Sequence, residues 1–233
     1  FGDATTSIDG VGTLRNALAR SGIDRFDLRE DDVQVHELDH RTSTATVLLL
    51  DVSHSMVLYG EDRITPAKQV AMALAELIET QYPKDSLDVA LFGDEARTVS
   101  VADLPFVTAG PYHTNTKAAL ALARTILRRR RHPNRRVVMV TDGKPSVLTV
   151  GTRIYKKSMG LDPRIVRATL EEAVTCRRER IPITTFMIAD DPYLREFVEE
   201  LTRVNKGQAY FASPDDLASA VFVDFLRNRR RRT

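Results

Sequence analysis

Hydrophobic and polar positions alternate with two different periodicities along this chain. From residue 45 onward, short apolar runs alternate with longer stretches in which apolar residues recur every three or four positions. Short apolar runs are typical of strands buried on both faces, and the longer spacing is typical of amphipathic helices. We predict strands at 47–50, 87–92, 96–99, 137–140, 183–188 and 209–211. We predict helices at 63–80, 118–130, 164–180 and 192–205, a last helix with Ser213 as N-cap and Pro214 in its first turn, and a loop at 143–163.

This order of elements predicts an α/β protein with a Rossmann-like, mostly parallel central sheet and helices on both faces. Residues 1–44 are polar and weakly patterned, with one short helix at 14–20 and a short strand at 33–35. We therefore divide the chain into an N-terminal extension (1–44), one α/β domain (45–226) and an Arg-rich tail (227–233).

Polar residues that could carry chemistry follow the predicted buried strands. Asp51, Ser53 and Ser55 come after the first strand, Asp142 comes after the strand at 137–140, and Thr114 stands just before a helix. Ligands of open α/β sheets bind at the carboxyl ends of the strands, so these loops are expected to converge on one edge.

Carboxylates and hydroxyls together form a set of oxygen donors. Such a set suits Mg²⁺, Mn²⁺ or Ca²⁺ and does not suit zinc or copper. Short side chains from three loops supply only part of an octahedral shell, so we expect an open coordination position that an external carboxylate could complete.

This constellation resembles the von Willebrand factor A (VWA) family. The signature of that family, the metal-ion-dependent adhesion site (MIDAS), is Asp-x-Ser-x-Ser followed by a distant Thr and a distant Asp, matched here by Asp51-Val52-Ser53-His54-Ser55, Thr114 and Asp142. The resemblance covers about residues 45–226. It implies that Ser53, Ser55 and Thr114 touch the metal directly, that Asp51 and Asp142 act mainly through waters, and that a partner's Asp or Glu fills the last position.

The Thr loop departs from the family pattern. The family usually has Gly-Gly-Thr or Gly-x-Thr, but this chain reads Pro111-Tyr112-His113-Thr114. His113 could therefore restrict the site or add a polar group beside it, and Thr116 is an alternative to Thr114. His54 and His113 are interpreted as surface neighbours of the site and not as ligands.

Within the family, the chain is most similar to bacterial intracellular members that accompany AAA+ ATPases of the MoxR and magnesium-chelatase type. The resemblance rests on the near absence of Cys, the Thr-Asn-Thr-x-x-Ala-Leu start of a helix at Thr114, and Asp224-Phe225-Leu226-Arg227 before a basic tail. It implies a MoxR-like ATPase as partner. The lone Cys176 excludes an internal disulfide and a Cys-rich zinc site, and we expect a cytoplasmic protein without a membrane segment.

The net charge of +2 hides an asymmetry, because residues 1–62 carry −7 and the remainder carries +9. Two Arg clusters account for much of the excess: Arg128, Arg129, Arg130, Arg131 and Arg229, Arg230, Arg231, Arg232. The simple interpretation is solvated helix ends. The alternative is an anionic partner, which makes an RNA- or ribonucleoprotein-binding protein our second hypothesis for function.

No pattern in the sequence indicates an enzyme. The chain has neither the Gly-x-Ser-x-Gly elbow of a serine hydrolase nor the Gly-x-x-x-x-Gly-Lys-Ser/Thr loop of a nucleotide hydrolase. We therefore expect a metal-dependent protein-interaction module and no catalysis.

Overall fold

The computed structural model describes residues 10–21, 27–33, 43–142, 144–151, 153–157, 160–188 and 191–230. The chain forms two compact units, residues 1–41 and residues 42–232, and each is described by itself. Among the described residues, no helix is both long and apolar enough to cross a membrane.

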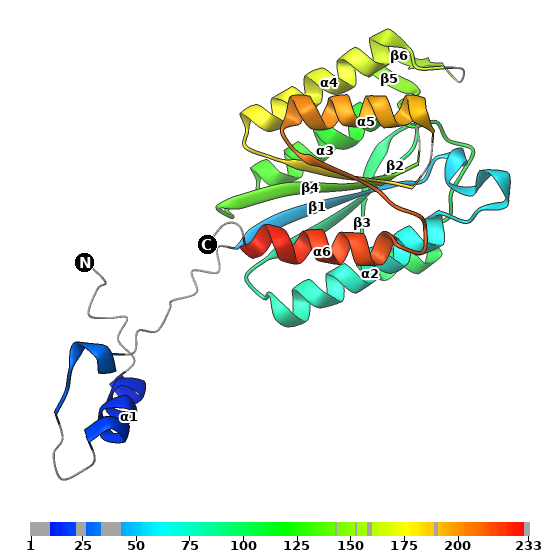
Figure 1. Ribbon diagram of the computed structural model, residues 1–233. Coiled ribbons are helices and arrows are strands. Elements are labelled where there is room, and N and C mark those ends of the chain that lie inside the picture. Colours follow the sequence, from blue (N-terminus) through cyan, green and yellow to red (C-terminus); the bar gives the residue numbers. More distant parts are fainter. Residues whose placement is uncertain are drawn as a thin grey trace. The chain divides into compact units, whose positions relative to one another are not determined.

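The larger unit is built on a six-stranded sheet in the order β3-β2-β1-β4-β7-β8 (Figure 1). Five strands run parallel, and β3 at one edge runs antiparallel to β2. The strands are β1 (Thr44–Asp51), β2 (Ser86–Phe92), β3 (Ala96–Val99), β4 (Asn134–Thr141), β7 (Ile183–Met187) and β8 (Gln208–Phe211). The mostly parallel sheet is therefore confirmed, with β1 and β4 at its centre.

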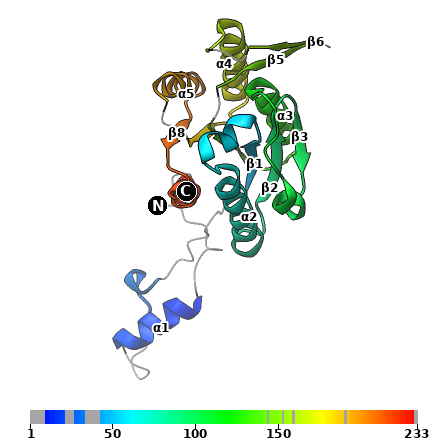
Figure 2. The same ribbon diagram turned by 90° about the vertical axis from the view of Figure 1, so that its right-hand side faces the viewer.

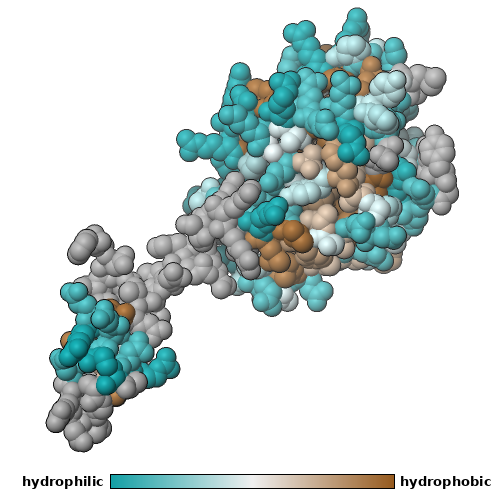
Figure 3. All heavy atoms as spheres, in the orientation of Figure 1, coloured by the Kyte–Doolittle hydropathy of each residue, from teal (hydrophilic) through white to brown (hydrophobic). Residues whose placement is uncertain are grey.

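Helices cover both faces of this sheet, as Figure 1 shows. On one face lie α2 (Ile64–Gln81) and α6 (Leu217–Arg230), and on the other lie α3 (Thr116–Arg128), α4 (Pro163–Arg178) and α5 (Pro192–Asn205). Two short 3₁₀ segments, η3 (His54–Gly60) and η4 (Val101–Phe106), follow β1 and β3. Figure 3 shows mostly hydrophilic residues over the outer helices, with hydrophobic residues in smaller patches.

Strand β1 explains why the sheet is buried on both sides. Leu48 and Leu50 point into the core beneath α2 and α6, whereas Val47 and Leu49 point into the core beneath α3, α4 and α5. Successive side chains of a strand face opposite ways, so an uninterrupted apolar run fills both cores. All four side chains are fully buried.

Polar residues at the helix ends set where the helices begin and end. Asp162 and Asp191 cap α4 and α5 by accepting backbone N–H hydrogen bonds, and a proline follows each of them. At the other end of α5, the chain passes so close to Ile183 that a Cβ at Gly207 would collide with the Ile183 carbonyl. Glycine therefore allows α5 to turn directly into β8.

The predicted loop at 143–163 contains a hairpin of β5 (Val147–Val150) and β6 (Arg153–Lys156), so that prediction is wrong in part. The missed signal is Gly151, which follows the mostly β-branched run Val147–Val150 and has a φ of +61°, a conformation that glycine adopts without strain.

Two helices begin two or more residues away from their predicted starts. Helix α3 starts at Thr116 because Asn115 accepts a hydrogen bond from Ala118 N and caps it. Helix α6 starts at Leu217 and not at Pro214, because the Ser213 hydroxyl closes a turn with Asp216. The backbone of α6 then continues to Arg230, through the first residues of the predicted tail.

The smaller unit contains α1 (Gly10–Ser21) and a 3₁₀ turn, η2 (Glu30–Asp32). Arg20 donates two hydrogen bonds to the Asp32 carboxylate, which connects the two elements and lowers the pKa of Asp32 to about 2. The predicted helix at 14–20 is confirmed within α1. Val33 is not in a strand, and the rest of the predicted strand at 33–35 lies outside the described residues.

Candidate metal centre

The predicted ligands lie at the carboxyl edge of the sheet. Asp51 is the last residue of β1, and Asp142 directly follows β4, its parallel neighbour. Figure 2 views the molecule from this side, with the cyan segment after β1 at its centre. Parallel strands therefore bring two aspartates that are far apart in the sequence to one place.

A chain of hydrogen bonds joins these two strand ends. The backbone N–H of Ser53 donates to Asp51 Oδ1 at 2.8 Å, and the hydroxyl oxygens of Ser53 and Ser55 are 3.1 Å apart. The Ser55 hydroxyl then donates to Asp142 Oδ1 at 2.8 Å. Four of the five predicted ligands are thus directly connected.

Thr114 belongs to the third loop, which is bonded to both of the others. The backbone N–H of His54 donates to the carbonyl of Tyr112 at 3.0 Å, two residues before Thr114. Ser146, four residues after Asp142, holds Thr114 at both backbone groups: its hydroxyl accepts from Thr114 N and its N–H donates to Thr114 O. Thr114 is only 3% exposed and directly precedes the capping residue of α3.

Asp51 is a fully buried carboxylate with every oxygen in a hydrogen bond. Its Oδ1 accepts from Ser53 N, and its Oδ2 accepts from the Thr141 hydroxyl at 2.6 Å. Burial and then repulsion by Asp142 raise the pKa of Asp51 to about 7, although the bonds from Ser53 and Thr141 oppose the rise. The edge therefore concentrates negative charge that the surrounding protein does not fully offset.

Arg63, one residue before α2, is part of the site and was not predicted from the sequence. Its Nη1 donates to Asp142 Oδ2 at 2.7 Å, and its Nε and Nη2 donate to Glu61 Oε2 at 3.0 and 2.7 Å. Burial lowers the pKa of Arg63, but hydrogen bonds to Glu61 and Asp142 outweigh it and raise that pKa above its ordinary value. A single Arg at a helix start carries no local signal, since its partner lies 79 positions away.

The predicted neighbours of the site have separate roles. His54 is exposed, and His113 turns to Asp94: its backbone N–H donates to Asp94 Oδ1 at 3.0 Å and its Nδ1 lies 3.3 Å from the same oxygen. Thr116 is the buried first residue of α3. The hydrogen bonds to Ser146 thus hold Thr114, not Thr116, in the loop.

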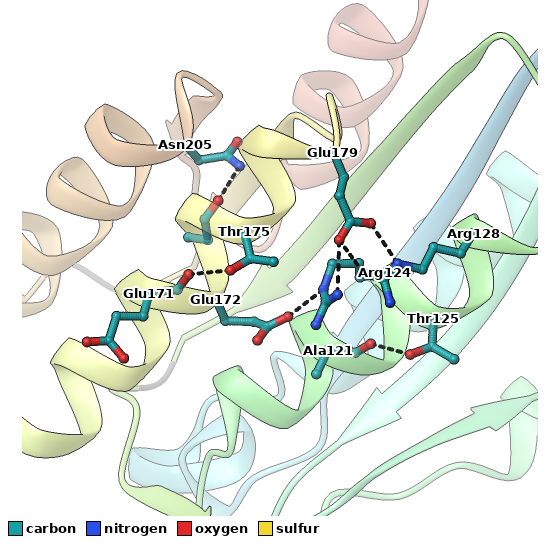
Figure 4. Close-up of polar contacts among 10 residues, drawn as sticks. Ala121, Arg124, Thr125, Arg128, Glu171, Glu172, Thr175, Glu179 and Asn205 are labelled. Atoms are coloured by element: carbon teal, nitrogen blue, oxygen red, sulfur yellow. Dashed lines mark hydrogen bonds and ion pairs between the residues drawn. The ribbon is translucent and has the colours of Figure 1, made fainter.

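Two arginines of the first Arg cluster are engaged in ion pairs. Arg128 donates two hydrogen bonds to Glu179, as Figure 4 shows, and Arg130 donates two to Asp88. Arg129 and Arg131 are exposed. Arg229 and Arg230 form the end of α6, and Arg231 and Arg232 lie outside the described residues.

The donor set at the edge fits a hard divalent cation. The described residues contain no cluster of three or more His, Cys, Asp or Glu that could hold a metal, so a cation here would depend on hydroxyl oxygens. Ser53, Ser55 and Thr114 would provide those oxygens, and the Asp51 and Asp142 carboxylates would provide the negative charge.

The parallel α/β fold, with these three loops at its carboxyl edge, defines a VWA-type domain, a class of domain that indicates a role in protein interaction. The chain belongs to the Rv0959-like family: the model of that family's vWA domain matches residues 44–226, and the model of its third domain matches residues 1–38.

The relatives and similar structures agree with this assignment. The uncharacterized protein Rv0959 of Mycobacterium tuberculosis is 36% identical over 99% of this chain, and the chain spans only 35% of that relative. PilB minor pilin from Streptococcus sanguinis has a TM-score of 0.64 at 13% identity, covering 85% of this chain and 64% of the pilin. The SpRpn10 VWA domain has a TM-score of 0.53 at 13% identity, covering 74% of this chain and 89% of that domain. At these identities the structures establish the fold alone.

Proposed function

We propose that this chain is a metal-dependent protein-interaction module whose carboxyl edge is a MIDAS. The observation that carries the proposal is the continuous path of hydrogen bonds from Asp51 through Ser53 and Ser55 to Asp142. This path lines up oxygen donors from loops after β1 and β4, and the loop before α3 joins them through His54 and Tyr112.

Each side chain has a defined role in this proposal. Ser53, Ser55 and Thr114 would hold the cation through their hydroxyl oxygens, and Asp51 and Asp142 would act through bound water and fix the hydroxyls by hydrogen bonds. Mg²⁺ is the expected ion, with Mn²⁺ or Ca²⁺ as substitutes that share its oxygen preference. When bound, the cation offers a Lewis-acidic position that a carboxylate of a partner protein can fill.

The module is proposed to be an adaptor and not an enzyme. The Ser55 hydroxyl donates a hydrogen bond to Asp142, and the ion pair with Arg63 neutralises that carboxylate, so it is not a free general base that would activate Ser55 as a nucleophile. The proposed partner is an AAA+ ATPase of the MoxR type that presents an acidic side chain. The ion pairs made by Arg128 and Arg130 leave less free positive charge for an RNA partner, and no similarity found here favours that alternative.

Metal binding is tested first, on the isolated chain. Isothermal titration with MnCl₂ should give one site, and Ser53→Ala combined with Ser55→Ala should weaken it by at least about tenfold, because two ligand oxygens are removed. Ser100→Ala is the matched control, since its hydroxyl bonds an exposed aspartate elsewhere. Equal affinity in all three proteins would contradict the metal site.

Partner binding is tested second. The immobilised chain is incubated with a lysate of its source in Mg²⁺, washed in Mg²⁺ or in EDTA, and the eluates are compared by mass spectrometry. We expect an AAA+ ATPase that EDTA releases and that Asp142→Ala fails to retain. Retention that ignores both EDTA and Asp142→Ala would remove the metal from the binding mechanism.

A further inference from the structure

Arg63 is a fixed cation beside the two aspartates of the site. Its backbone N–H donates to Met56 O at 3.0 Å, its Nε and Nη2 hold Glu61, and its Nη1 holds Asp142. The Arg63 side chain is 15% exposed and that of Asp142 is fully buried. A guanidinium bonded to two carboxylates, on a backbone that is itself hydrogen-bonded, has little freedom to leave.

Both oxygens of Asp142 already accept a hydrogen bond, but the two donors differ in kind. Ser55 donates to Oδ1 through a hydroxyl, which can rotate its hydrogen away and offer a lone pair to a cation. Arg63 donates to Oδ2 and has no lone pair to offer, and its charge is permanent at any physiological pH. A divalent cation that binds among these oxygens is therefore repelled by the positive charge of Arg63.

The formal charges of the buried groups show how Arg63 changes the net charge of the site. With Asp51 and Asp142 ionised, the two carboxylates and Arg63 sum to −1, and a divalent cation makes the site +1. Without Arg63 the same loaded site would be neutral. Glu61 carries a further negative charge, but its side chain is 58% exposed, and water screens it more strongly than the buried groups.

We propose that Arg63 is the specificity-determining residue of this site. Its charge lowers the affinity for the cation and keeps the metal-loaded site positive. The open coordination position of the metal then selects an anionic carboxylate over a neutral ligand. The inference rests on the proposed function, because it concerns the same metal centre. It explains why a basic side chain is bonded into a pocket of oxygen donors, where it would otherwise only compete with the metal.

The test measures two affinities whose changes should have opposite signs. Mn²⁺ binding is measured by isothermal titration, and acetate binding to the Mn²⁺-loaded protein is measured by the loss of water-proton relaxation as acetate displaces bound water. Arg63→Gln keeps a hydrogen-bond donor and removes the charge. We expect it to bind Mn²⁺ about tenfold more tightly and to require about tenfold more acetate.

Two further variants separate charge from structure. Arg63→Lys keeps the charge but loses the planar fork that spans Glu61 and Asp142, so both affinities should shift in the same directions as in Arg63→Gln but by less. Arg130→Gln makes the same change in net charge at the exposed pair with Asp88, two residues beyond the end of α3, and should move neither affinity. If Arg63→Gln does not fold, Glu61→Gln tests the same balance, since removing this exposed carboxylate should weaken Mn²⁺ and tighten acetate.

The outcomes distinguish this inference from the function it rests on. No Mn²⁺ binding by the unmodified chain would overturn the metal site itself. Normal Mn²⁺ binding by that chain, with Arg63→Gln unchanged or weaker for Mn²⁺, would overturn the role of Arg63 and leave the metal site standing. Opposite shifts in the two affinities, smaller in Arg63→Lys than in Arg63→Gln, would establish it.

Discussion

Strand β4 carries a buried Asp–Arg pair near each of its ends, and the two pairs are built differently. At its carboxyl end, Arg63 meets Asp142 at 2.7 Å, with Asp51 close enough to repel Asp142. At its amino end, Arg136 of β4 lies 3.8 Å from Asp224 of α6. Both aspartates are almost fully buried, so their different surroundings decide what each pair does.

The Asp224 pair is enclosed by partners. Tyr210 and Asn228 donate to Asp224 Oδ1, while Arg136 donates to the Thr46 hydroxyl and lies 4.7 Å from the centre of the Phe225 ring. Arg136 and Arg227 both stabilise the charge of this one carboxylate, and the bonds join β4, β8 and α6. We interpret this pair as a structural link between the last helix and the sheet.

The carboxyl edge instead holds two carboxylates against one guanidinium, with hydroxyls between them. Uncompensated buried charge costs stability, so a fold retains it only where something else is gained. The comparison teaches that excess charge, and not the mere presence of a buried ion pair, distinguishes the candidate metal centre from a structural contact.

Breaking the structural pair should have the largest effect on stability. Arg136→Ala leaves Asp224 buried without its salt-bridge partner and removes the contact with Phe225, so we expect a loss of about 3–5 kcal/mol in the free energy of unfolding. Urea denaturation measures it. Mn²⁺ affinity should not change, because the pair lies at the other end of the sheet.

The matched control for this change removes both charges. Arg136→Met combined with Asp224→Leu should cost less than Arg136→Ala alone, because it leaves no unpaired buried charge. If the double variant is as unstable as the single one, packing and not charge explains the loss.

The pH dependence of stability should reveal the excess charge at the other end. The pKa of Asp51 is about 7 in the fold, against an ordinary value of 3.8. Between these values the folded chain binds a proton that the unfolded chain has released, so stability falls as pH rises, by at most about 4 kcal/mol from about pH 4 to about pH 7. Urea denaturation in EDTA at several pH values measures this trend.

Asp51→Asn isolates this effect from other titrating groups. The variant should be the more stable of the two metal-free proteins near pH 7, and the difference should shrink toward pH 4. A difference that is constant with pH would contradict the raised pKa of Asp51.

Most of the fold could be predicted from residue patterns because it depends on local periodicity. The apolar run at Val47–Leu50 gives a strand buried on both faces, and the spacing from Ile64 to Gln81 gives an amphipathic helix. The hairpin at β5 and β6 escaped prediction because all four residues of β6 are exposed, so no apolar face in the sequence marks that strand. Helix starts at Thr116 and Leu217 depend on side-chain hydrogen bonds that periodicity does not register.

The candidate site was predictable only in part, for the same reason. Asp51, Ser53 and Asp142 follow buried strands, so the rule that parallel strands present their ends at one edge finds them. Arg63 and Ser146 are bonded to residues far away in the chain, so no local spacing of residues predicts that they belong to the site. The polar residues of the candidate site can thus be found from sequence, but the charges that surround them are seen only in the structure.

Between the buried Arg136–Asp224 pair and the surface pairs lies the network that joins α3 to α4. Arg124 bonds Glu172 at 2.7 Å and Glu179 at 3.0 Å, as Figure 4 shows, and its side chain is 17% exposed. Arg124→Ala should cost about 1–2 kcal/mol, less than Arg136→Ala because water reaches the carboxylates left behind. Arg167→Ala is the control on α4, where an 83% exposed Arg pairs with Glu171 and a change below about 0.5 kcal/mol is expected. Equal losses in urea denaturation would contradict the assigned role of burial.

Apart from the Arg167 control, the smallest effect is expected at Arg130, which makes bidentate hydrogen bonds to Asp88. Its Nε and Nη2 donate at 3.0 and 2.6 Å, but its side chain is 41% exposed. Arg130→Ala should therefore cost only about 0.5 kcal/mol, and the cost should vanish at about 1 M salt, where charges are screened within about 3 Å. A double-mutant cycle with Asp88→Asn, by urea denaturation at low and high salt, isolates the pair. A coupling above about 2 kcal/mol that survives salt would show that geometry outweighs burial in this protein, and the contrast between the two ends of β4 would then need another explanation.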